Sequence, residues 1–481
     1  MSNFLKNTLM YSIGNVLMKA FQFFLLPIYT QYMSTTEYGI VSSVQVMSIF
    51  LLMSFTLAID RVIFRLLYDY KSGEERRLFL GTSSFSIFIF SIVGLLLVFV
   101  LKFFFVDGTL IGIDFYPYIF LMVLEVFFIT FNLVPRAYLQ IEGKSKLYVK
   151  LSILDFVVSS SFILYFIVLK DEGAYGMLKG RLLGVLLTLP FYLKLTYDII
   201  IFKFDFKIFK NILNYSWPGI VIILSTWLLD QSDRIFLGKY FDMSQVGIYS
   251  LGYKIAGISL MIVGAINQAY TPYFYKLANS VNQNESKNKL TIINTLYIVI
   301  VIIVTFIISL FSEDFLILFI DSKYGRANDY IIPISVIYVF QLSSLVFNLS
   351  IYQNKKNVLM MMINFLGGGI CVVLNLFLIP TFGSFGAIIA TFVSYFIIFC
   401  IKFYFSKKNY WVPINLGELS LLFFVLFSIV TLFKFITLNI WLGLLLKVIT
   451  SLSIVVIIYI KDGFFIKTTI EKYIRQKNKI N

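Results

Sequence analysis

Polar side chains recur at helical spacing inside otherwise apolar segments, and they are the groups with which this chain could do chemistry. Asn15, Lys19 and Gln22 stand at i, i+4 and i+7, so one helix would place them on one face. Lys254 lies in a second apolar segment. A charge in such a segment is costly unless it faces protein or water. The two lysines therefore predict a site that suits an anionic ligand.

Acidic and amide groups occupy further apolar segments. Glu125 and Asp155 could bind a cation or a proton, and Gln341 and Asn348 add amides. Interhelical hydrogen bonding is an equally open explanation for the Asn, Gln and Ser side chains. It is a weaker explanation for Lys19 and Lys254, whose charge is harder to bury.

Two charged clusters lie near the ends of apolar segments. Asp233 and Arg234 are adjacent, and we expect an ion pair that fixes the end of its helix. Arg61 and Arg65 are four residues apart and share a face, where arginine could grip the phosphate of an anionic headgroup. Ordinary interfacial charge explains these two arginines somewhat better.

The elements that must position these groups are transmembrane helices. Of 481 residues, 59% are hydrophobic and only 14% are charged, which is too little charge for a soluble chain. The apolar residues form runs of about 20, the length that spans a bilayer as a helix. The sequence thus predicts an all-α polytopic protein of about 14 spans. We place them at 10–32, 40–59, 81–105, 116–136, 147–169, 174–196, 212–231, 246–270, 290–311, 330–352, 358–379, 384–404, 417–437 and 441–460.

Composition also excludes several classes. The net charge of +15 is spread between apolar runs rather than gathered in one basic patch, so we expect no nucleic-acid partner. The chain has no histidine, which removes the commonest metal ligand and general base. Its two cysteines, Cys371 and Cys400, have no metal spacing. We expect no cofactor and no metal, and we find no cleaved signal peptide.

The distribution of lysine and arginine predicts the orientation. If the N-terminus is cytoplasmic, most of the 40 basic residues fall in cytoplasmic segments and few on the opposite side. Both termini are then cytoplasmic, in a multi-pass membrane protein. Basic residues of this kind also meet anionic membrane lipids.

The chain repeats itself. Lys6 to Ser12 and Lys210 to Ser216 both read K-N-x-L-x-Y-S, and similar pairs are Gly39 with Gly247 and Gly173 with Gly383. The offsets of 204, 208 and 210 residues predict two six-helix bundles in parallel orientation. We expect lobes at 1–205 and 206–408, two added helices at 409–460 and a basic cytoplasmic tail at 461–481.

The added helices carry no polar stripe. They are predicted to face lipid, with Lys447 close enough to an end for its side chain to reach the interface. A third glycine pattern, Gly176, Gly180 and Gly184, predicts a close-packed helix face.

The segment from Asp233 to Gly238, followed by Val246 to Lys254, resembles the span 7–8 signature of Wzx-type polysaccharide-biosynthesis (O-antigen oligosaccharide) flippases. So does the opening helix at Tyr11 and Ser12, followed by Glu37 to Ile40. This family lies within the multidrug/oligosaccharidyl-lipid/polysaccharide exporter superfamily. The resemblance covers the whole chain: the number of helices, the parallel repeat, the short loops and the two terminal helices.

The resemblance implies a transporter and no enzyme. Such a protein moves undecaprenyl-diphosphate-linked oligosaccharide across the inner membrane by alternating access, for synthesis of O-antigen, lipopolysaccharide or capsule. A cationic central cavity would hold the diphosphate on Lys19 and Lys254 and the sugars on Asn15, Gln22, Gln341 and Asn348. Glu125 and Asp155 are candidates for ion coupling. A polysaccharide polymerase and a chain-length regulator would be partners.

Two rivals share the superfamily. A drug or cation antiporter would use a buried acidic site, which Glu125 and Asp155 could supply, but Lys19 and Lys254 favour an anion. A lipid II flippase would use the same mechanism on another headgroup. A membrane glycosyltransferase, polymerase or ligase would need large outer loops, which the spans leave no room for. No G-x-x-x-x-G-K-[ST] loop is present to hydrolyse ATP.

Overall fold

The computed structural model describes residues 18, 20–104, 112–280, 283–436, 439–454 and 456, and every regular element in these ranges is a helix. Eleven of the helices are long and apolar enough to cross a membrane. The all-α, polytopic prediction is therefore confirmed. The helices are α2 (Leu26–Tyr32), α3 (Thr35–Thr56), α4 (Ile59–Leu66), α5 (Gly73–Phe104), α6 (Phe120–Ile141), α7 (Ser145–Leu164), α8 (Gly173–Ile199), α9 (Phe206–Tyr240), α10 (Met243–Ala256), α11 (Ile258–Ala278), α12 (Gln283–Phe319), α13 (Asn328–Gln353), α14 (Asn357–Lys408) and α15 (Leu416–Phe435), with short turns η1 (Leu67–Asp69), η3 (Phe115–Ile119), η4 (Tyr165–Leu169) and η5 (Ser322–Ala327).

One helix accounts for two of the predicted spans. The 52 residues of α14 are longer than a bilayer requires, and Gly383 interrupts them with non-helical dihedrals (φ 56°, ψ −134°). This glycine lies between the predicted spans 358–379 and 384–404, so α14 consists of two spans joined by a kink. A further apolar helix, Ile440–Ile454, matches the start of the last predicted span.

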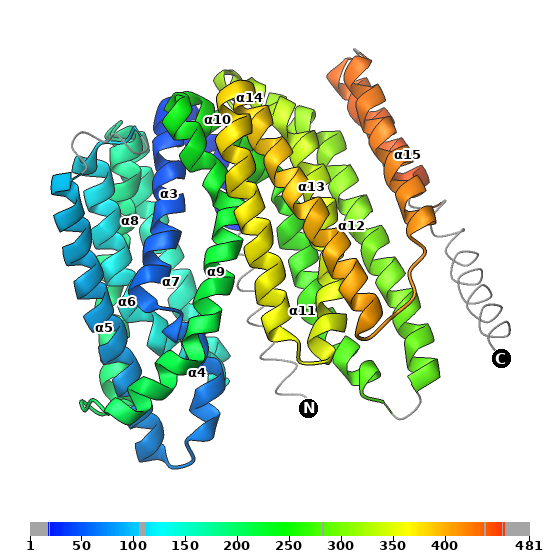
Figure 1. Cartoon of the computed structure of the whole chain (residues 1–481). Helices are drawn as coiled ribbons and strands as arrows, with labels where there is room; N and C mark the ends of the chain where they lie inside the picture. The colour runs from blue at the N-terminus through cyan, green and yellow to red at the C-terminus, as the bar shows by residue number, and fades with distance from the viewer. Residues whose placement is uncertain are drawn as a thin grey trace. The chain divides into compact units, whose positions relative to one another are not determined.

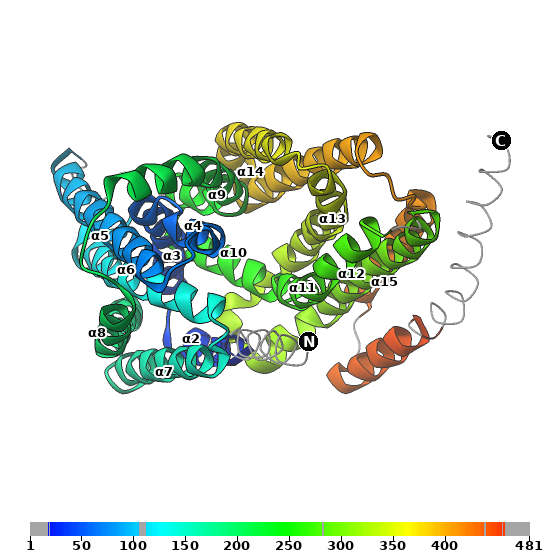
Figure 2. The same cartoon turned by 90° about the horizontal axis from the view of Figure 1, so that it is seen from below.

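The chain forms two compact units. Unit 1 comprises Met1–Ser250 and Asn364–Ala387, and unit 2 comprises Leu251–Ile363 and Ile388–Asn481. Within unit 1, α5, α6, α7 and α8 pack side by side, while α11, α12 and α13 pack together in unit 2 (Figures 1 and 2). Helix α9 contacts α3, α4 and α5, and so belongs to unit 1. The predicted lobes at 1–205 and 206–408 follow the sequence repeat, whereas the two units follow the contacts between helices. The predicted lobes therefore stay a prediction.

Side-chain caps fix where several helices begin. Ser34 and Glu37 form a capping box at the start of α3: the Ser34 hydroxyl accepts from the Glu37 amide, and the Glu37 carboxylate accepts from the Ser34 amide at 2.8 Å. The Asp205 carboxylate caps α9, accepting from the amides of Lys207 and Ile208. Such caps satisfy amides that have no partner inside the helix.

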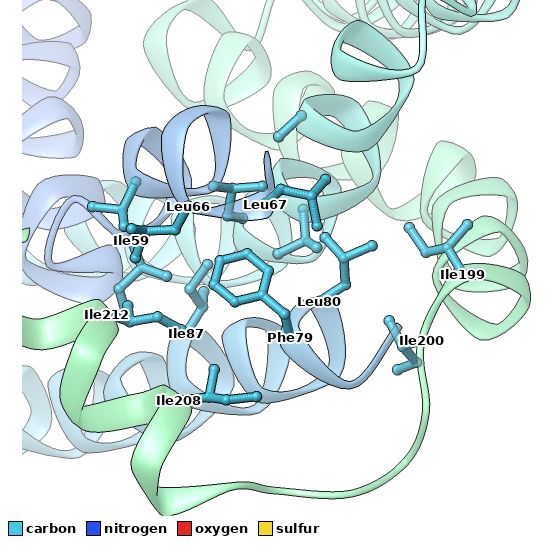
Figure 3. Packing of buried hydrophobic residues seen from close by; sticks show 14 residues of the cluster. Ile59, Leu66, Leu67, Phe79, Leu80, Ile87, Ile199, Ile200, Ile208 and Ile212 are labelled. Carbon is cyan, nitrogen blue, oxygen red and sulfur yellow. The ribbon is translucent and has the colours of Figure 1, made fainter. Parts of the chain in front are cut away.

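A cluster of buried apolar side chains joins α4, α5, α6 and α9 at one end of unit 1 (Figure 3). Phe79 of α5 is fully buried at its centre, and Ile208 and Ile212 reach it from the first turns of α9. The cluster therefore anchors the start of α9 on unit 1.

The predicted glycine face is present between α7 and α8. A Cβ atom added at Gly180 would lie 2.7 Å from the Ile163 nitrogen, and one at Gly184 would lie 2.7 Å from the Ser159 Cα. Neither glycine leaves room for a side chain, so α7 and α8 touch backbone to backbone. This prediction is confirmed.

The last helices are attached by charge as well as by apolar contact. Lys447 donates to Asp314 of α12 at 2.6 Å, and the two side chains are only 8% and 9% exposed. The prediction that the Lys447 side chain extends to the membrane interface is therefore wrong. The buried carboxylate of Asp314 explains the difference. An ammonium group without an acidic partner would extend toward water, whereas one that forms an ion pair can stay buried.

Candidate functional site

An arginine in α6 is held from two neighbouring helices of unit 1. The Arg136 guanidinium forms an ion pair with Asp155 of α7 and donates to the Tyr192 hydroxyl of α8 at 3.0 Å. Tyr192 in turn donates to the same Asp155 oxygen at 2.5 Å. Tyr192 is fully buried, whereas the Arg136 side chain is 33% exposed. The network therefore fixes the guanidinium while leaving part of it accessible.

A second ion pair joins α6 to α8, with the acid on α6 and the arginine on α8. Arg181 of α8 donates through Nε to Glu125 Oε1 at 3.0 Å, and a second guanidinium nitrogen lies at the same distance. The Glu125 side chain is 5% exposed and the Arg181 side chain 23%. In this pair the acid is buried and the base is partly open, whereas Asp155 of the first pair is itself 20% exposed.

These two pairs give unit 1 oriented, permanently charged guanidinium groups inside its membrane spans. A guanidinium presents donors in a planar fork that matches phosphate oxygens. A partly exposed charge at this depth is tolerated where it faces water or protein rather than lipid. The geometry can therefore hold an anion, and Glu125 and Asp155 serve to position the two arginines.

Each of these carboxylates has a second oxygen that does not take part in the ion pair. Glu125 Oε2 and Asp155 Oδ1 are buried, and neither has a hydrogen-bond partner among the described residues. Both acids were predicted as candidates for ion coupling. In this structure each is committed through its other oxygen to an arginine.

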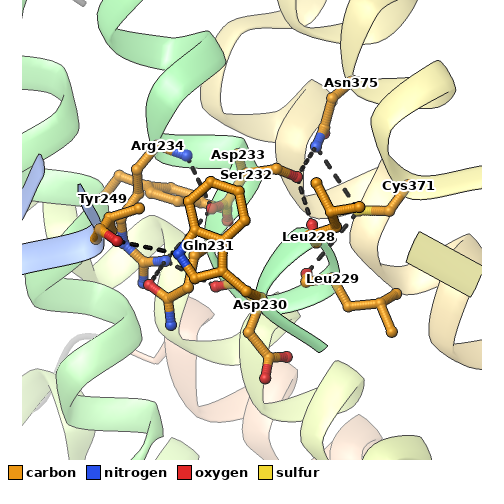
Figure 4. Close-up of polar contacts among 12 residues, drawn as sticks. Leu228, Leu229, Asp230, Gln231, Ser232, Asp233, Arg234, Tyr249, Cys371 and Asn375 are labelled. Carbon is orange, nitrogen blue, oxygen red and sulfur yellow. Dashed lines mark hydrogen bonds and ion pairs between the residues drawn. The ribbon is translucent and has the colours of Figure 1, made fainter. Parts of the chain in front are cut away.

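The expected ion pair at the end of α9 is present (Figure 4). Arg234 Nη1 lies 3.3 Å from Asp233 Oδ1, and the backbone amide of Arg234 donates to the same oxygen at 2.8 Å. Tyr249 of α10 donates to the other oxygen, Asp233 Oδ2, at 2.5 Å. Asp233 is 1% exposed and Arg234 8%. This cluster ties α10 to α9 and offers little surface to a ligand.

Unit 2 carries the predicted Lys254, Gln341 and Asn348. Lys254 is exposed in the last turn of α10, where a cation interacts favourably with the helix dipole. Gln341 and Asn348 lie seven residues apart on α13 and are half-buried. Asn348 Oδ1 is buried without a hydrogen-bond partner in the part of the chain that the structure describes.

The remaining predicted residues of unit 1 are on its surface or outside the described residues. Arg61 and Arg65 are exposed on α4, and Arg65 pairs with Asp69 at 2.6 Å. Helix α4 is separated from α3 by Leu57 and Ala58, both in the left-handed region. Gln22 is exposed. Asn15 and Lys19 lie outside the described residues.

Sequence reasoning did not select Arg136, Arg181 or Tyr192 as site residues. The sequence did contain one signal for the two arginines. A charge within a membrane span is costly, so each arginine needs a partner of opposite charge on a neighbouring helix. Within the described ranges, no three His, Cys, Asp or Glu side chains gather as a metal site would require.

Comparisons with known proteins point to one superfamily. The family described as "Polysaccharide biosynthesis protein" matches residues 4–278, more than half of the chain, and the MatE family matches residues 218–381. An "Uncharacterized membrane protein" of Haemophilus influenzae is 24% identical over 68% of this chain and 78% of its own length. The "Lsg locus putative protein 1" of the same organism is 33% identical over 78 residues, which span only 20% of that relative.

Two solved structures with a similar fold are distant from this chain in sequence. A "Lipid II flippase MurJ, inward closed conformation" aligns with a TM-score of 0.73 at 14% identity, covering 95% of this chain and 99% of that one. An inward-facing multidrug resistance MATE transporter aligns with a TM-score of 0.58 at 14% identity, covering 85% and 98%. The chain therefore belongs to the polysaccharide biosynthesis protein family, within the multidrug/oligosaccharidyl-lipid/polysaccharide exporter superfamily, and it has the fold of the flippase and transporter structures named above.

Proposed function

We propose that this transporter is a flippase for undecaprenyl-diphosphate-linked oligosaccharide. It would move each unit from the cytoplasmic to the outer face of the bacterial inner membrane by alternating access, for O-antigen, lipopolysaccharide or capsule synthesis. The observation that carries the proposal is the pair of oriented, partly exposed arginines inside the spans of unit 1, Arg136 and Arg181.

The chemistry of the substrate matches these groups. A diphosphate carries concentrated negative charge, and arginine can engage two of its oxygens at once. Asp155 and Tyr192 remove much of the freedom of the Arg136 side chain beforehand, so less conformational entropy is lost when the diphosphate is bound. In our proposal Lys19 and Lys254 add positive charge along the path of the headgroup.

The sugars would meet uncharged groups. Asn15, Gln22, Gln341 and Asn348 remain our candidates, because amides both donate to and accept from hydroxyls. Arg61 and Arg65 are proposed to attract the anionic headgroup at the cytoplasmic entrance. The lipid tail would stay in the bilayer while the headgroup crosses.

A drug or cation antiporter is less well supported by the geometry. Such a protein would need an acid free to bind a cation, whereas Glu125 and Asp155 each pair with an arginine. Their unpartnered oxygens could still take up a proton, and we keep both as candidates for coupling transport to an ion gradient. A polysaccharide polymerase and a chain-length regulator are the proposed partners, with both termini of the chain in the cytoplasm.

A deletion strain tests the proposal. Surface polysaccharide should disappear, and intact lipid-linked oligosaccharide should accumulate on the cytoplasmic face of the membrane. Unchanged polymer with new sensitivity to cationic drugs would favour the antiporter. Accumulation of lipid II instead would favour a lipid II flippase. Complementation with the Lys19→Ala and Lys254→Ala variants should fail although both proteins insert, and normal polymer in both would overturn these two assignments.

A further inference from the structure

Two glycines related by the sequence repeat touch each other's helices. A Cβ added at Gly39 of α3 would lie 1.8 Å from the Met243 carbonyl oxygen, and one at Gly247 of α10 would lie 2.1 Å from the Thr35 carbonyl oxygen. Gly39 and Gly247 are 208 residues apart, and so are Thr35 and Met243. The contact is therefore reciprocal: each glycine meets the carbonyl that corresponds to the one its partner meets.

The segments around the contact also correspond. Ser34 caps α3, and Asp242, which is 208 residues later, caps the start of α10 by accepting from the Gln245 amide at 2.7 Å. The hydroxyls of Thr35 and Ser244 are hydrogen-bonded across the contact at 2.7 Å. A reciprocal contact between equivalent surfaces is the property of a two-fold axis. The axis of the internal repeat therefore passes between Gly39 and Gly247.

Each of the two segments is in addition fastened within its own repeat. A Cβ added at Gly173, which opens α8, would lie 1.6 Å from Glu37 Oε1. Gln245 donates to Ser384 at 3.0 Å, next to Gly383. Glu37 corresponds to Gln245 at the 208-residue offset, and Gly173 corresponds to Gly383 at 210. Both glycines have positive φ, 50° and 56°, where a side chain would be strained. Each segment is thus attached to another helix start of its own repeat.

We infer that the crossing of α3 and α10 at Gly39 and Gly247 is a gate, closed in this structure, that must separate for the transporter to open at that end. The inference rests on the proposed function, because alternating access requires one end to open while the other closes. In the predicted orientation this end is the outer one. Glycine on both sides lets the two backbones meet without interlocking side chains, so the surfaces can part without rearranging a packed core.

A disulfide across the gate tests the inference. The Thr35 and Ser244 oxygens are 2.7 Å apart, so sulfur atoms at these positions would be within bonding reach. The variant is Thr35→Cys with Ser244→Cys in a background without Cys371 and Cys400, which itself supports surface polysaccharide. Oxidation should crosslink the two halves, shown by one band after cleavage at an inserted protease site, and should abolish export. Reduction should restore it.

Two results would overturn the inference: failure to crosslink, or full export by the crosslinked protein. In the second case the proposed function would survive, since export would still depend on the chain. If the deletion strain and the strain with the crosslinked protein both keep normal export, the proposed function itself is wrong.

Glycine variants give a readout that does not need export. Gly39→Ala should force α3 and α10 apart and raise the rate at which a membrane-impermeant maleimide labels Thr35→Cys at least severalfold. Gly369→Ala is the matched control, because a Cβ at this helical glycine would meet no atom within 4 Å. Equal labelling in both variants would show that the contact at Gly39 does not hold the end closed.

Discussion

The two units treat an acid–base pair inside a membrane span in different ways. In unit 1 the bases remain partly open, with Arg136 33% and Arg181 23% exposed beside acids that are 20% and 5% exposed. In unit 2 the pair of Asp314 and Lys447 is closed on both sides, at 9% and 8%. The same chemistry is thus accessible at these two pairs of unit 1 and sealed at this pair of unit 2, as it is at Asp233 and Arg234 of unit 1.

This difference separates two roles. A sealed pair has no surface with which to bind a ligand, so Asp314 and Lys447 can only hold the helix Ile440–Ile454 against α12. An accessible guanidinium retains donors for another group while its acid fixes its position. Exposure, rather than the presence of charge, is therefore what marks Arg136 and Arg181 as binding residues.

Among these acid–base pairs, the largest effect on export is expected from Arg136→Ala. The variant removes the proposed phosphate contact and leaves Asp155 without its arginine, so export should fall at least about tenfold, equivalent to 1.4 kcal/mol or more. Surface polysaccharide measured against the amount of inserted protein would report it. Arg136→Lys should restore export only in part, because an ammonium group lacks the planar fork.

Arg76→Ala is the matched control for this prediction. Arg76 pairs with Glu142 at 2.6 Å and is 31% exposed, close to the exposure of Arg136, but it lies in the first turns of α5, next to a loop. Exposed pairs of this kind contribute about 0–1 kcal/mol. Equal export by the two alanine variants would mean that accessibility does not distinguish a binding arginine, and the comparison would fail.

The sealed pair is expected to affect stability and not the binding of the substrate. Lys447→Ala leaves Asp314 buried without its base, and breaking a buried pair in this way costs about 3–5 kcal/mol. The detergent-solubilised protein should therefore unfold several degrees below wild type. Replacing both residues with leucine should recover most of the loss, because no charge is then left unpaired.

Lys434→Ala provides the reference for the sealed pair. Lys434 lies 3.8 Å from Asp329, and these side chains are 35% and 56% exposed. Removing this contact should change the unfolding temperature little, because exposed ion pairs contribute about 0–1 kcal/mol. Equal destabilisation by Lys434→Ala and Lys447→Ala would contradict the tethering role.

The sequence was sufficient for features that depend on spacing along one helix or on the internal repeat. The helical spans, the glycine face of α8 and the pairing of Asp233 with Arg234 are local patterns. The repeat offset of 208 residues also led to Gly39 and Gly247, although not to their contact.

Partners on other helices were not predictable in the same way. Arg181 is 56 residues from Glu125, and Lys447 is 133 residues from Asp314. Helical periodicity gives the face of a helix that a residue occupies, but it does not say which helix packs against that face. Lys447 was misassigned for this reason. A lysine near the end of a span can either extend to the membrane interface or pair with an acid on another helix, and the sequence does not show which.

The smallest effect is expected at Asn348 of unit 2, and its sign is the informative part. Asn348 Oδ1 is buried without a hydrogen-bond partner among the described residues, which costs free energy in the resting protein. Asn348→Leu should therefore leave the unfolding temperature unchanged or slightly higher. Export should still fall a few-fold if the amide binds a sugar hydroxyl during transport. Surface polysaccharide is measured in the complemented strain, and the unfolding temperature is measured on the protein solubilised from that strain.

Ser335→Ala supplies the contrast on the same helix. The Ser335 hydroxyl is also buried without a partner in the described part of the chain, but Ser335 is not among the residues proposed to contact the substrate. Its removal should relieve the same kind of cost and leave export alone. If Asn348→Leu behaves like Ser335→Ala, the amide is only a packing defect, and the uncharged polar groups of α13 lose their assignment to the sugars. If export falls in Asn348→Leu alone, the unsatisfied amide is kept at a cost in stability because transport uses it. The donors and acceptors that bind the ligand would then include a group of unit 2 as well as the accessible arginines of unit 1.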